Sequence, residues 1–285
     1  MNPKVSIVVP VYNREVLIRR TLDSILSQSF KDFECIVSDN HSTDGTHAVL
    51  VEYADHDSRI KILSQPQNVG PVKNWLAGVA ACRGEFVKIL FSDDWMESDC
   101  LAEALEVFEG LPSIGFVYFH AEIEGSSIRD GKRESRVESG FSFLWRSLVS
   151  HRDAPVSPSS ALFRREDVIG SLYTSIETLD GSDYLVTGAG PDQAIYLDAA
   201  DNHEFIFYIN KTMIHYGINK CSITVDTGTK RPGHLLRNYF MAQLAFLERY
   251  SGRRTLTGRI MRICIYGFLV KLFIRYRLIP KMIFR

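Results

Sequence analysis

The chain has 285 residues, of which 45% are hydrophobic and 24% charged, and its formal net charge at pH 7 is −1. This length allows one large or two small domains with a substantial hydrophobic core. Five cysteines, an odd number with no Cys-x-x-Cys pair, favour neither a disulfide framework nor a zinc site and fit a reducing cytoplasm. The amino terminus lacks the charged and apolar regions of a signal peptide, and no repeat or low-complexity linker divides the sequence.

The first predicted elements are a strand and a helix. Val5–Val9 is a short apolar run that predicts a strand ended by Pro10, with Tyr12 and Asn13 beyond it. A helix is predicted next, because four apolar residues recur on one helical face. They are Ile18, Leu22, Ile25 and Leu26.

Further strands and helices follow in the same order. A second apolar run, Phe33–Val37, precedes the polar loop Ser38–Thr46 and another helix. After Asn68–Gly70 comes a helix that carries Lys73 and Asn74 near its start. Its apolar stripe consists of Val72, Trp75, Leu76, Val79 and Ala80. Strand, polar loop and helix, repeated within about a hundred residues, predict βαβ units and a parallel sheet.

Two adjacent carboxylates follow the next apolar run. Phe86–Phe91 predicts a buried strand, and Ser92, Asp93 and Asp94 come directly after it. Adjacent acids repel each other unless a positive charge joins them, and a divalent cation is the usual guest of oxygen ligands. The alternative interpretation is a solvated turn that caps the next helix.

Polar residues at the ends of these strands are expected to share a crevice, because loops after parallel strands converge at one edge of a sheet. They are Asn13, Asp39, Lys73, Asp93 and Asp94. Asp39 suits a hydroxyl- or imide-bearing group, Lys73 supplies a charge for phosphate, and the Asp pair can hold a metal that bridges a diphosphate. The sequence has neither Gly-x-Gly-x-x-Gly after the first strand nor a P-loop motif, which disfavours dinucleotide oxidoreductases and P-loop nucleotidases.

As a set, these motifs resemble glycosyltransferase family 2. The resemblance covers residues 3 to about 100 and rests on Val5–Asn13, Asp39–Thr46, Asn68–Gly70 with Lys73 and Asn74, Gly84–Phe86 and Ser92–Trp95. It implies the GT-A fold, an α/β architecture with a Rossmann-like, mostly parallel sheet flanked by helices. It also implies transfer of a sugar from a nucleotide-sugar donor, here expected to be a UDP-sugar, with inversion at the anomeric carbon.

The resemblance also assigns roles to residues. Those expected to bind the nucleotide are Pro10, Tyr12, Asn13, Asp39, Lys73, Asn74, Ser92 and Asp93, the first four through the uracil and ribose. Lys73 stands where the family often has an arginine. Asp93 and Asp94 fill the later part of the family's Asp-x-Asp motif and would bind Mn²⁺ or Mg²⁺, while Phe91 occupies the place of its first Asp.

The second half of the chain is expected to bind the acceptor. Pro158–Arg165 resembles the strand that follows the family's variable acceptor loop, and Gly188–Gln193 opens a helix at the place of the catalytic acid. An inverting transfer needs a base that takes the proton of the acceptor hydroxyl, and Asp192 is the expected base. Asp183 is the nearest competitor, and a helix cap is the alternative role of Asp192.

His215 falls near the point where the family often has a histidine that touches the metal or diphosphate, and we assign it as a third metal ligand. A structural histidine is the alternative. The stretch Gly217–Gly233 holds Lys220, Lys230 and Arg231 and is interpreted either as a lid over the diphosphate or as a solvated loop.

The C-terminal segment concentrates positive charge. From Gly252 to Arg285 there are nine Lys or Arg residues and no Asp or Glu, interleaved with apolar residues. Its longest uncharged run, Ile263–Val270, is far shorter than the ~20 residues that span a bilayer. We therefore predict a basic amphipathic helix at an anionic membrane surface. Packing on the catalytic domain or an oligomer contact are the alternatives, and no binding motif supports nucleic acid.

The predicted domain organisation is a GT-A catalytic domain over residues 1–232 and C-terminal helices over 233–285. Residues 1–110 would bind the nucleotide-sugar and 111–232 the acceptor, a glycan or polyprenyl-linked hydroxyl of cell-surface polysaccharide synthesis. The enzyme would act at the cytoplasmic face of a membrane, without a nucleic-acid partner. A nucleotide-sugar-binding protein without turnover is the alternative, motivated by Phe91. A nucleotidyltransferase is a lower alternative, because its glycine- and lysine-rich loop is absent.

Overall fold

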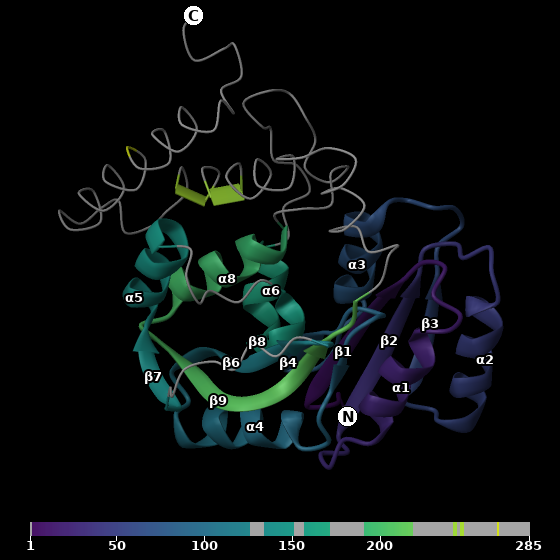
Figure 1. Ribbon diagram of the computed structural model, residues 1–285, viewed down its shortest axis with the longest axis horizontal. Helices are drawn as coiled ribbons and strands as arrows, with labels where there is room; N and C mark the ends of the chain where they lie inside the picture. Colours follow the sequence, from purple (N-terminus) through teal and green to yellow (C-terminus); the bar gives the residue numbers. More distant parts are fainter. Residues whose placement is uncertain are drawn as a thin grey trace, which may run out of the picture.

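The computed structural model describes residues 2–125, 134–150, 157–171 and 191–218, together with residues 242, 243, 246, 247 and 267. In chain order (Figure 1) the elements are β1 (Val5–Val11), α1 (Ile18–Leu26), β2 (Phe33–Asp39), α2 (Thr46–His56), β3 (Ile60–Ser64), α3 (Pro71–Ala80), β4 (Phe86–Ile89), β5 (Trp95–Met96), α4 (Cys100–Gly110), β6 (Ile114–Ile123), β7 (Arg136–Ser139), α5 (Gly140–Trp145), η1 (Arg146–Ser150), η2 (Pro158–Ser160), β8 (Ala161–Arg164), α6 (Arg165–Ser171), α8 (Pro191–Asn202) and β9 (Phe205–Tyr216).

The strands form one sheet in the order β3-β2-β1-β4-β8-β6-β9-β5, with β7 also paired to β9. The four strands at one side, β3-β2-β1-β4, are parallel, as the sequence predicts. Beyond β4 only the β6–β9 pair is parallel, and β8, β5 and β7 pair antiparallel. The expectation of a mostly parallel sheet is therefore wrong for the second half. The repeat of strand, loop and helix stops after β4. Most later neighbours in the sheet therefore lack the helical crossover connection that parallel pairing requires.

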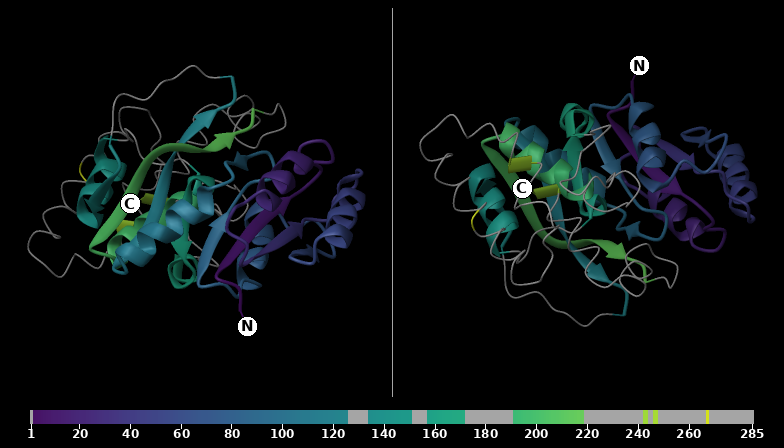
Figure 2. Two further views of the ribbon diagram at one scale, coloured as in Figure 1. Left: turned by 90° about the horizontal axis from the view of Figure 1, so that it is seen from below. Right: turned by 90° about the horizontal axis from the view of Figure 1, so that it is seen from above.

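Helices cover both faces of this sheet (Figure 1, Figure 2). α1, α2 and α4 pack on one face, and α3, α5, α6 and α8 pack on the other. Successive residues of β1 enter alternate layers: Val8 lies in the layer of α3, whereas Ile7 and Val9 lie in that of α1. A strand buried on both faces has to be apolar throughout, which explains the uninterrupted apolar runs in the sequence.

β1 continues through Pro10 instead of ending before it. Its pairing with β4 ends at Val8, whose carbonyl accepts a hydrogen bond of 2.9 Å from the Leu90 amide. The Val11 carbonyl faces β2 and accepts from the Asn40 amide at 2.9 Å. Because backbone groups of successive residues point to opposite sides, the missing N–H of Pro10 faces the β4 side, beyond the last pair. Proline therefore removes no sheet hydrogen bond here.

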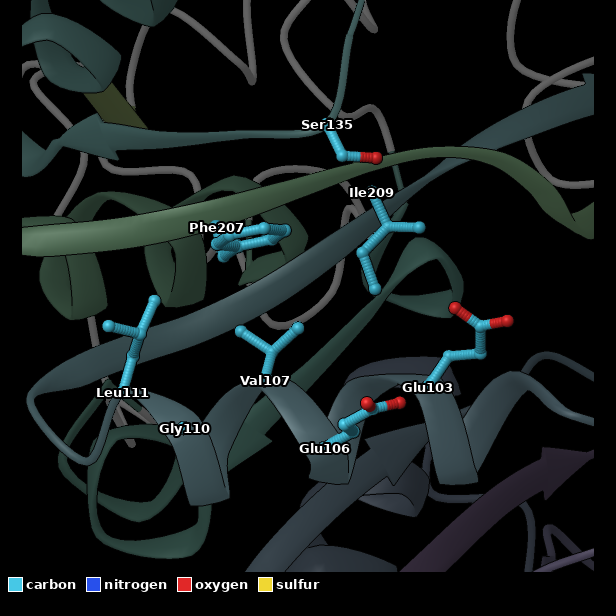
Figure 3. Close-up of a pocket in the computed structure, with 8 residues that line it drawn as sticks. All are labelled: Glu103, Glu106, Val107, Gly110, Leu111, Ser135, Phe207 and Ile209. Carbon is cyan, nitrogen blue, oxygen red and sulfur yellow. The ribbon is translucent and has the colours of Figure 1, made fainter.

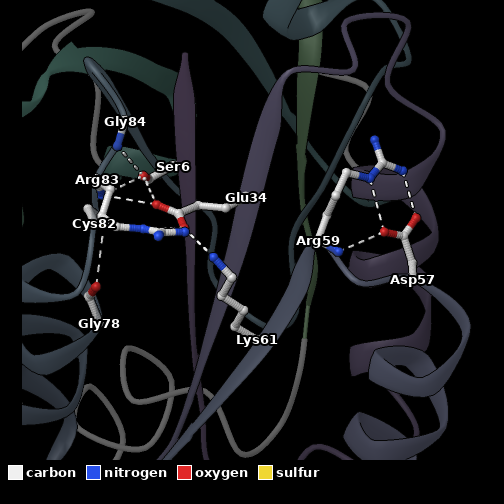
Figure 4. Close-up of polar contacts among 9 residues, drawn as sticks. All are labelled: Ser6, Glu34, Asp57, Arg59, Lys61, Gly78, Cys82, Arg83 and Gly84. Atoms are coloured by element: carbon white, nitrogen blue, oxygen red, sulfur yellow. Dashed lines mark hydrogen bonds and ion pairs between the residues drawn. The ribbon is translucent and has the colours of Figure 1, made fainter. Parts of the chain in front are cut away.

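A buried carboxylate joins β1, β2 and the start of β4 near the amino ends of these strands (Figure 4). Glu34 accepts hydrogen bonds from the Ser6 hydroxyl at 2.8 Å, Lys61 Nζ at 2.7 Å and Arg83 Nη2 at 2.7 Å. Burial alone would raise the pKa of Glu34, but these hydrogen bonds outweigh it and lower the pKa to about 2. Gly84 lies so near that a Cβ there would sit 2.6 Å from the Ser6 amide nitrogen.

Part of the C-terminal segment packs on the core. Ala242, Gln243, Phe246 and Leu247 are buried, and the last two belong to the same apolar cluster as residues of α3 and α8. In the segment 252–285, the structure describes Gly267 alone, so the predicted amphipathic helix lies outside the described residues. Within the parts that are described, no helix has the length and hydropathy to cross a membrane. The domain boundary at residue 232 stays a prediction.

We predict that Glu34→Gln lowers the free energy of unfolding by about 2 kcal/mol at neutral pH, because it removes charge-assisted hydrogen bonds to Arg83 and Lys61. The pKa of Glu34 is lower in the folded than in the unfolded state, so its contribution is complete above about pH 4.5 and is lost as the pH falls towards 2. Urea titrations should show that the difference in free energy of unfolding between wild type and Glu34→Gln is smaller at pH 3 than at pH 7. Glu85→Gln, at an exposed pair with Lys4, is the control and should cost less than about 1 kcal/mol. A difference that does not vary with pH would contradict this assignment.

Candidate active site

The loops after β1 and β2 are hydrogen-bonded to each other at the carboxyl edge of the parallel strands. The Asn13 amide donates to the Ser42 hydroxyl at 3.0 Å, and the Asn13 side-chain oxygen accepts from the Thr43 amide at 2.8 Å. Asn13 and His41 both have left-handed backbones, with φ of 51° and 63°. This conformation is uncommon for residues other than glycine, and residues that adopt it tend to cluster at functional sites.

Asp39 lies at the centre of this loop contact and is 3% exposed. Its Oδ1 accepts hydrogen bonds from the Ser42 amide at 3.0 Å and the Ser42 hydroxyl at 2.6 Å. Its Oδ2 lies 3.3 Å from Nδ1 of His47, an exposed residue at the start of α2. The carboxylate is therefore held in one orientation before any ligand arrives. Ser42 and His47 were not singled out by sequence reasoning, although both lie in or beside the polar loop that follows β2.

The two predicted residues at the start of α3 have different surroundings. Asn74 is buried, and its amide donates to the Ser38 carbonyl at 2.7 Å and accepts from the Ser38 hydroxyl at 2.9 Å. These contacts fix α3 against β2, and the role of Asn74 in nucleotide binding stays a prediction. Lys73, one residue earlier, is exposed at the helix start and is free of this packing role.

Asp93 and Asp94 occupy a turn after β4, in which the Asp94 amide donates to the Phe91 carbonyl at 2.9 Å. Asp94 is 5% exposed and Asp93 is half-buried. One Asp94 oxygen accepts from the Gly217 amide at 3.2 Å, and the Phe91 amide at the start of the turn donates to the Ser159 hydroxyl at 3.1 Å. The segment before β8 and the end of β9 thus both contact the turn that follows β4.

The electrostatics of this pair differ from those of an ordinary surface turn. Burial, followed by the charge of Asp93, raises the pKa of Asp94 to about 7. Burial also raises the pKa of Asp93, although the nearby charges of Arg14 and Arg20 oppose the shift. Two carboxyl groups that are costly to ionise together fit a divalent cation, whose charge would favour both carboxylates.

Among the described residues, no three His, Cys, Asp or Glu side chains converge on one point. The expected third metal ligand, His215, has its Nε2 2.7 Å from Glu97 Oε1. Its ring stacks on Trp95, with centroids 5.1 Å apart, and the Arg20 guanidinium lies 3.4 Å from the same indole. β5 and β9 pair Trp95 with His215, which explains the stack. The structure therefore does not bring His215 together with the two aspartates, and a cation here would take its other ligands from phosphate and water.

Asp192 lies in the first turn of α8, where its Oδ1 accepts from the Gln193 amide at 2.9 Å. One turn later, the Tyr196 hydroxyl donates to the Ser157 carbonyl at 2.8 Å and lies 3.0 Å from the Ser160 hydroxyl. Because Ser159 of the same segment accepts from the Phe91 amide, the segment 157–161 connects α8 with the turn that carries the aspartate pair. Asp183 and the predicted lid beyond residue 218 lie outside the described residues.

A hollow of about 350 Å³ lies between α4 and β9, away from every predicted site residue (Figure 3). It is lined by Glu103, Glu106, Val107, Gly110, Leu111, Ser135, Phe207 and Ile209. None of the predicted site residues lines it. We take the polar residues at the strand ends as the candidate active site, because they include the held carboxylate of Asp39 and the buried Asp94, whose pKa is raised.

Residues 6–170 match the family described as Glycosyl transferase family 2. The match covers more than half of the chain, and the chain belongs to this family. Glycosyltransferase GlyA of Streptococcus pneumoniae is 28% identical over 233 residues, 79% of this chain and 32% of that protein. A GalNAc(5)-diNAcBac-PP-undecaprenol beta-1,3-glucosyltransferase of Campylobacter jejuni is 41% identical over 105 residues, 36% of this chain and 34% of that protein. The chain thus spans about a third of the length of these two relatives.

Solved structures share the fold. Residues 1–349 of S. aureus TarS, in complex with UDP-GlcNAc, superpose with a TM-score of 0.63 at 19% identity, covering 94% of this chain and 81% of that one. The mannosyltransferase PcManGT of Pyrobaculum calidifontis, in complex with GDP-Man and Mn²⁺, superposes with a TM-score of 0.57 at 20% identity, covering 95% of this chain and 75% of that one. The family and the GT-A fold suggested by the sequence motifs are confirmed.

Asp94→Asn should stabilise the metal-free protein at alkaline pH. The pKa of Asp94 is higher in the folded than in the unfolded state, so the wild type loses stability as the pH rises from about 4 through 7. An amide carries no such penalty, and the variant should be more stable by about 2–4 kcal/mol at pH 8 yet nearly unchanged at pH 4. Urea unfolding in EDTA at both pH values measures this. Asp99→Asn, at an exposed ion pair with Lys211, should lack the alkaline gain. Equal stability of Asp94→Asn and wild type at pH 8 would mean that the Asp94 charge is compensated.

Proposed function

We propose that this protein is an inverting glycosyltransferase that moves a sugar from a nucleotide-sugar, in the first place a UDP-sugar, to a hydroxyl of a glycan or lipid-linked acceptor of cell-surface polysaccharide synthesis. The observation that carries the proposal is the pair of half-buried Asp93 and buried Asp94 after a strand of the parallel half of the sheet, in a chain of this family whose Asp39 is held in the loop after β2. Two similar proteins support these classes: TarS forms a complex with UDP-GlcNAc, and the Campylobacter jejuni glucosyltransferase is named for an undecaprenol-linked acceptor.

On the donor side, the held carboxylate of Asp39 is proposed to bind the nucleoside, together with Pro10, Tyr12 and Asn13 of the neighbouring loop. Lys73, exposed at the start of α3, is proposed to reach the phosphates. Asp93 and Asp94 are proposed to hold Mn²⁺ or Mg²⁺, which when bound would neutralise charge on the departing diphosphate. Ser92, buried directly before them, and Asn74, buried beside Lys73, remain in the proposed nucleotide-binding set.

On the acceptor side, we propose Asp192 as the base. The support is that Asp192 lies at the start of α8, and that Tyr196 of this helix contacts the segment 157–161, whose Ser159 accepts from Phe91 in the turn of the aspartates. It would take the proton of the acceptor hydroxyl while the oxygen attacks the anomeric carbon from the face opposite the diphosphate. Asp183 remains the competing candidate.

Binding and turnover of the donor test this proposal in one set of variants. Asp39→Ala should weaken UDP and uridine by similar factors, because the lost contact is to the nucleoside. Asp94→Ala should leave uridine unchanged and remove the gain in UDP affinity that Mn²⁺ gives. Asp192→Asn should keep both affinities and lose ~10²–10⁴-fold in turnover. Calorimetry with uridine, UDP and UDP plus Mn²⁺, and UDP release from UDP-sugars, are the measurements.

Glu106→Ala, in the separate hollow on α4, serves as the control and should change none of these quantities. Affinity for UDP-sugars without any UDP release, with acceptor extracts present, would favour the alternative of a binding protein without turnover. A loss for UDP but not uridine in Asp39→Ala would place Asp39 near the diphosphate and reverse the proposed orientation of the donor.

We also propose that the basic segment 252–285 attaches the enzyme to an anionic membrane surface, with each basic residue near it worth ~1 kcal/mol. Truncation after Ser251 should abolish sedimentation with anionic liposomes and preserve UDP binding, because buried Phe246 and Leu247 are retained. Truncation after Asn238 is the contrast: it removes those two side chains from the core and should lower the melting temperature. Full-length protein that ignores liposomes of every anionic content, at low salt, would eliminate membrane attachment.

A further inference from the structure

Lys88 is a fully buried lysine in β4, at 0% exposure. Strand alternation puts it on the same face as Phe86 and Leu90, in the apolar layer beneath α1 and α4. Its ammonium donates to the backbone carbonyls of Ser159 and Ala161, the latter at 3.3 Å, and lies 5.5 Å from the centre of the Phe119 ring. Among the described residues no carboxylate forms an ion pair with it. Burying a charge in this way is costly, so the contacts it makes have to matter to the fold or to the site.

The residue that Lys88 holds contacts the turn that carries Asp93 and Asp94. Ser159 is itself at 0% exposure. Its carbonyl accepts from Lys88, and its hydroxyl accepts from the Phe91 amide at 3.1 Å. The Phe91 carbonyl in turn accepts from the Asp94 amide at 2.9 Å, so Ser159 fixes the residue on which this turn closes.

The position of Lys88 in the sheet explains why a side chain is needed here. The β4–β8 ladder pairs Phe86 with Arg164 and Val87 with Phe163, and no later residue of β4 is paired with β8. Beyond that point the two segments are held together by hydrogen bonds from the Lys88 ammonium to two carbonyls and from the Phe91 amide to the Ser159 hydroxyl. The Lys88 side chain thus replaces backbone hydrogen bonds that β4 and β8 no longer form.

We propose that Lys88 is a positioning residue of the donor site: through Ser159 and Phe91 it sets the position of the turn that carries Asp93 and Asp94, so that the affinity of the aspartate pair for a divalent cation depends on a lysine that touches neither cation nor nucleotide. The proposal rests on the proposed function of Asp93 and Asp94. Sequence reasoning assigned Lys88 to an apolar strand and missed it. Partners that orient a metal ligand in this indirect way commonly contribute 10–100-fold in metal affinity.

The test is Mn²⁺ binding at saturating UDP, followed by the electron paramagnetic resonance signal of free Mn²⁺, which requires no turnover. Lys88→Met and Ser159→Ala should each weaken Mn²⁺ by about 10–100-fold. If Lys88 acts through Ser159, the double variant should bind Mn²⁺ no more weakly than the weaker-binding of the two single variants, because both substitutions interrupt the same series of contacts. Ser159→Ala keeps the test decisive if Lys88→Met does not fold, since it removes only a hydroxyl.

Ser171→Ala is the matched control, because Ser171 is a buried serine whose hydroxyl donates to the Asp167 carbonyl at 2.6 Å, in α6. It should leave Mn²⁺ affinity unchanged whatever its effect on the melting temperature. Wild-type Mn²⁺ affinity in both Lys88→Met and Ser159→Ala, with lowered melting temperatures, would show that Lys88 only stabilises the fold and would overturn the inference alone. Losses that add in the double variant would overturn the connection through Ser159. A wild-type protein that binds UDP but no Mn²⁺ would overturn the metal role of the aspartates and the inference with it.

Discussion

β4 pairs with β1 on one side and with β8 on the other, and the candidate site depends on this double pairing. The pairing with β1 carries the strand into the parallel half of the sheet and brings its carboxyl end beside the loops of Asn13 and Asp39. The pairing with β8 brings the segment 157–161, and through it α8, to the same end. A strand of four residues, Phe86–Ile89, thus joins the half expected to bind the donor to the half expected to bind the acceptor.

Two buried acids at opposite ends of this sheet have opposite surroundings. Glu34, near the amino ends of the strands, is surrounded by Arg83, Lys61 and Ser6, and its pKa is lowered to about 2. Asp94, at the carboxyl ends, is buried beside another acid, and its pKa is raised to about 7. The first charge is compensated by the protein and supports the fold. The second is ionised at a cost, and perturbed carboxyl groups of this kind are found more often at functional sites, which makes Asp94 the stronger site candidate.

The crevice is preorganised by residues that also serve the fold. Asn13 and Ser42 hold the loops after β1 and β2 together, and Ser42 orients Asp39. Asn74 fixes α3 against β2, which leaves Lys73 at the helix start as the exposed member of the pair. A site whose side chains are already held loses less conformational entropy when a ligand binds.

Local patterns in the sequence were enough to predict β1, β2 and β4, the helices α1 and α3, the meeting of the loops after β1 and β2, and the family. Each of these depends on apolar periodicity or on residues within one loop, and the parallel order follows from the repeated helix between strands. The tertiary structure alone decided the rest. The antiparallel pairing of β4 with β8, the pairing of His215 with Glu97 and the contact of Lys88 with Ser159 join residues 71 or more positions apart. A lysine inside an apolar run reads as one charge on a strand, and the sequence carries no local signal of the carbonyls that accept from it. Those carbonyls are brought to Lys88 by the pairing of distant strands. The burial of Lys88 and its hydrogen-bond partners therefore depend on the tertiary structure.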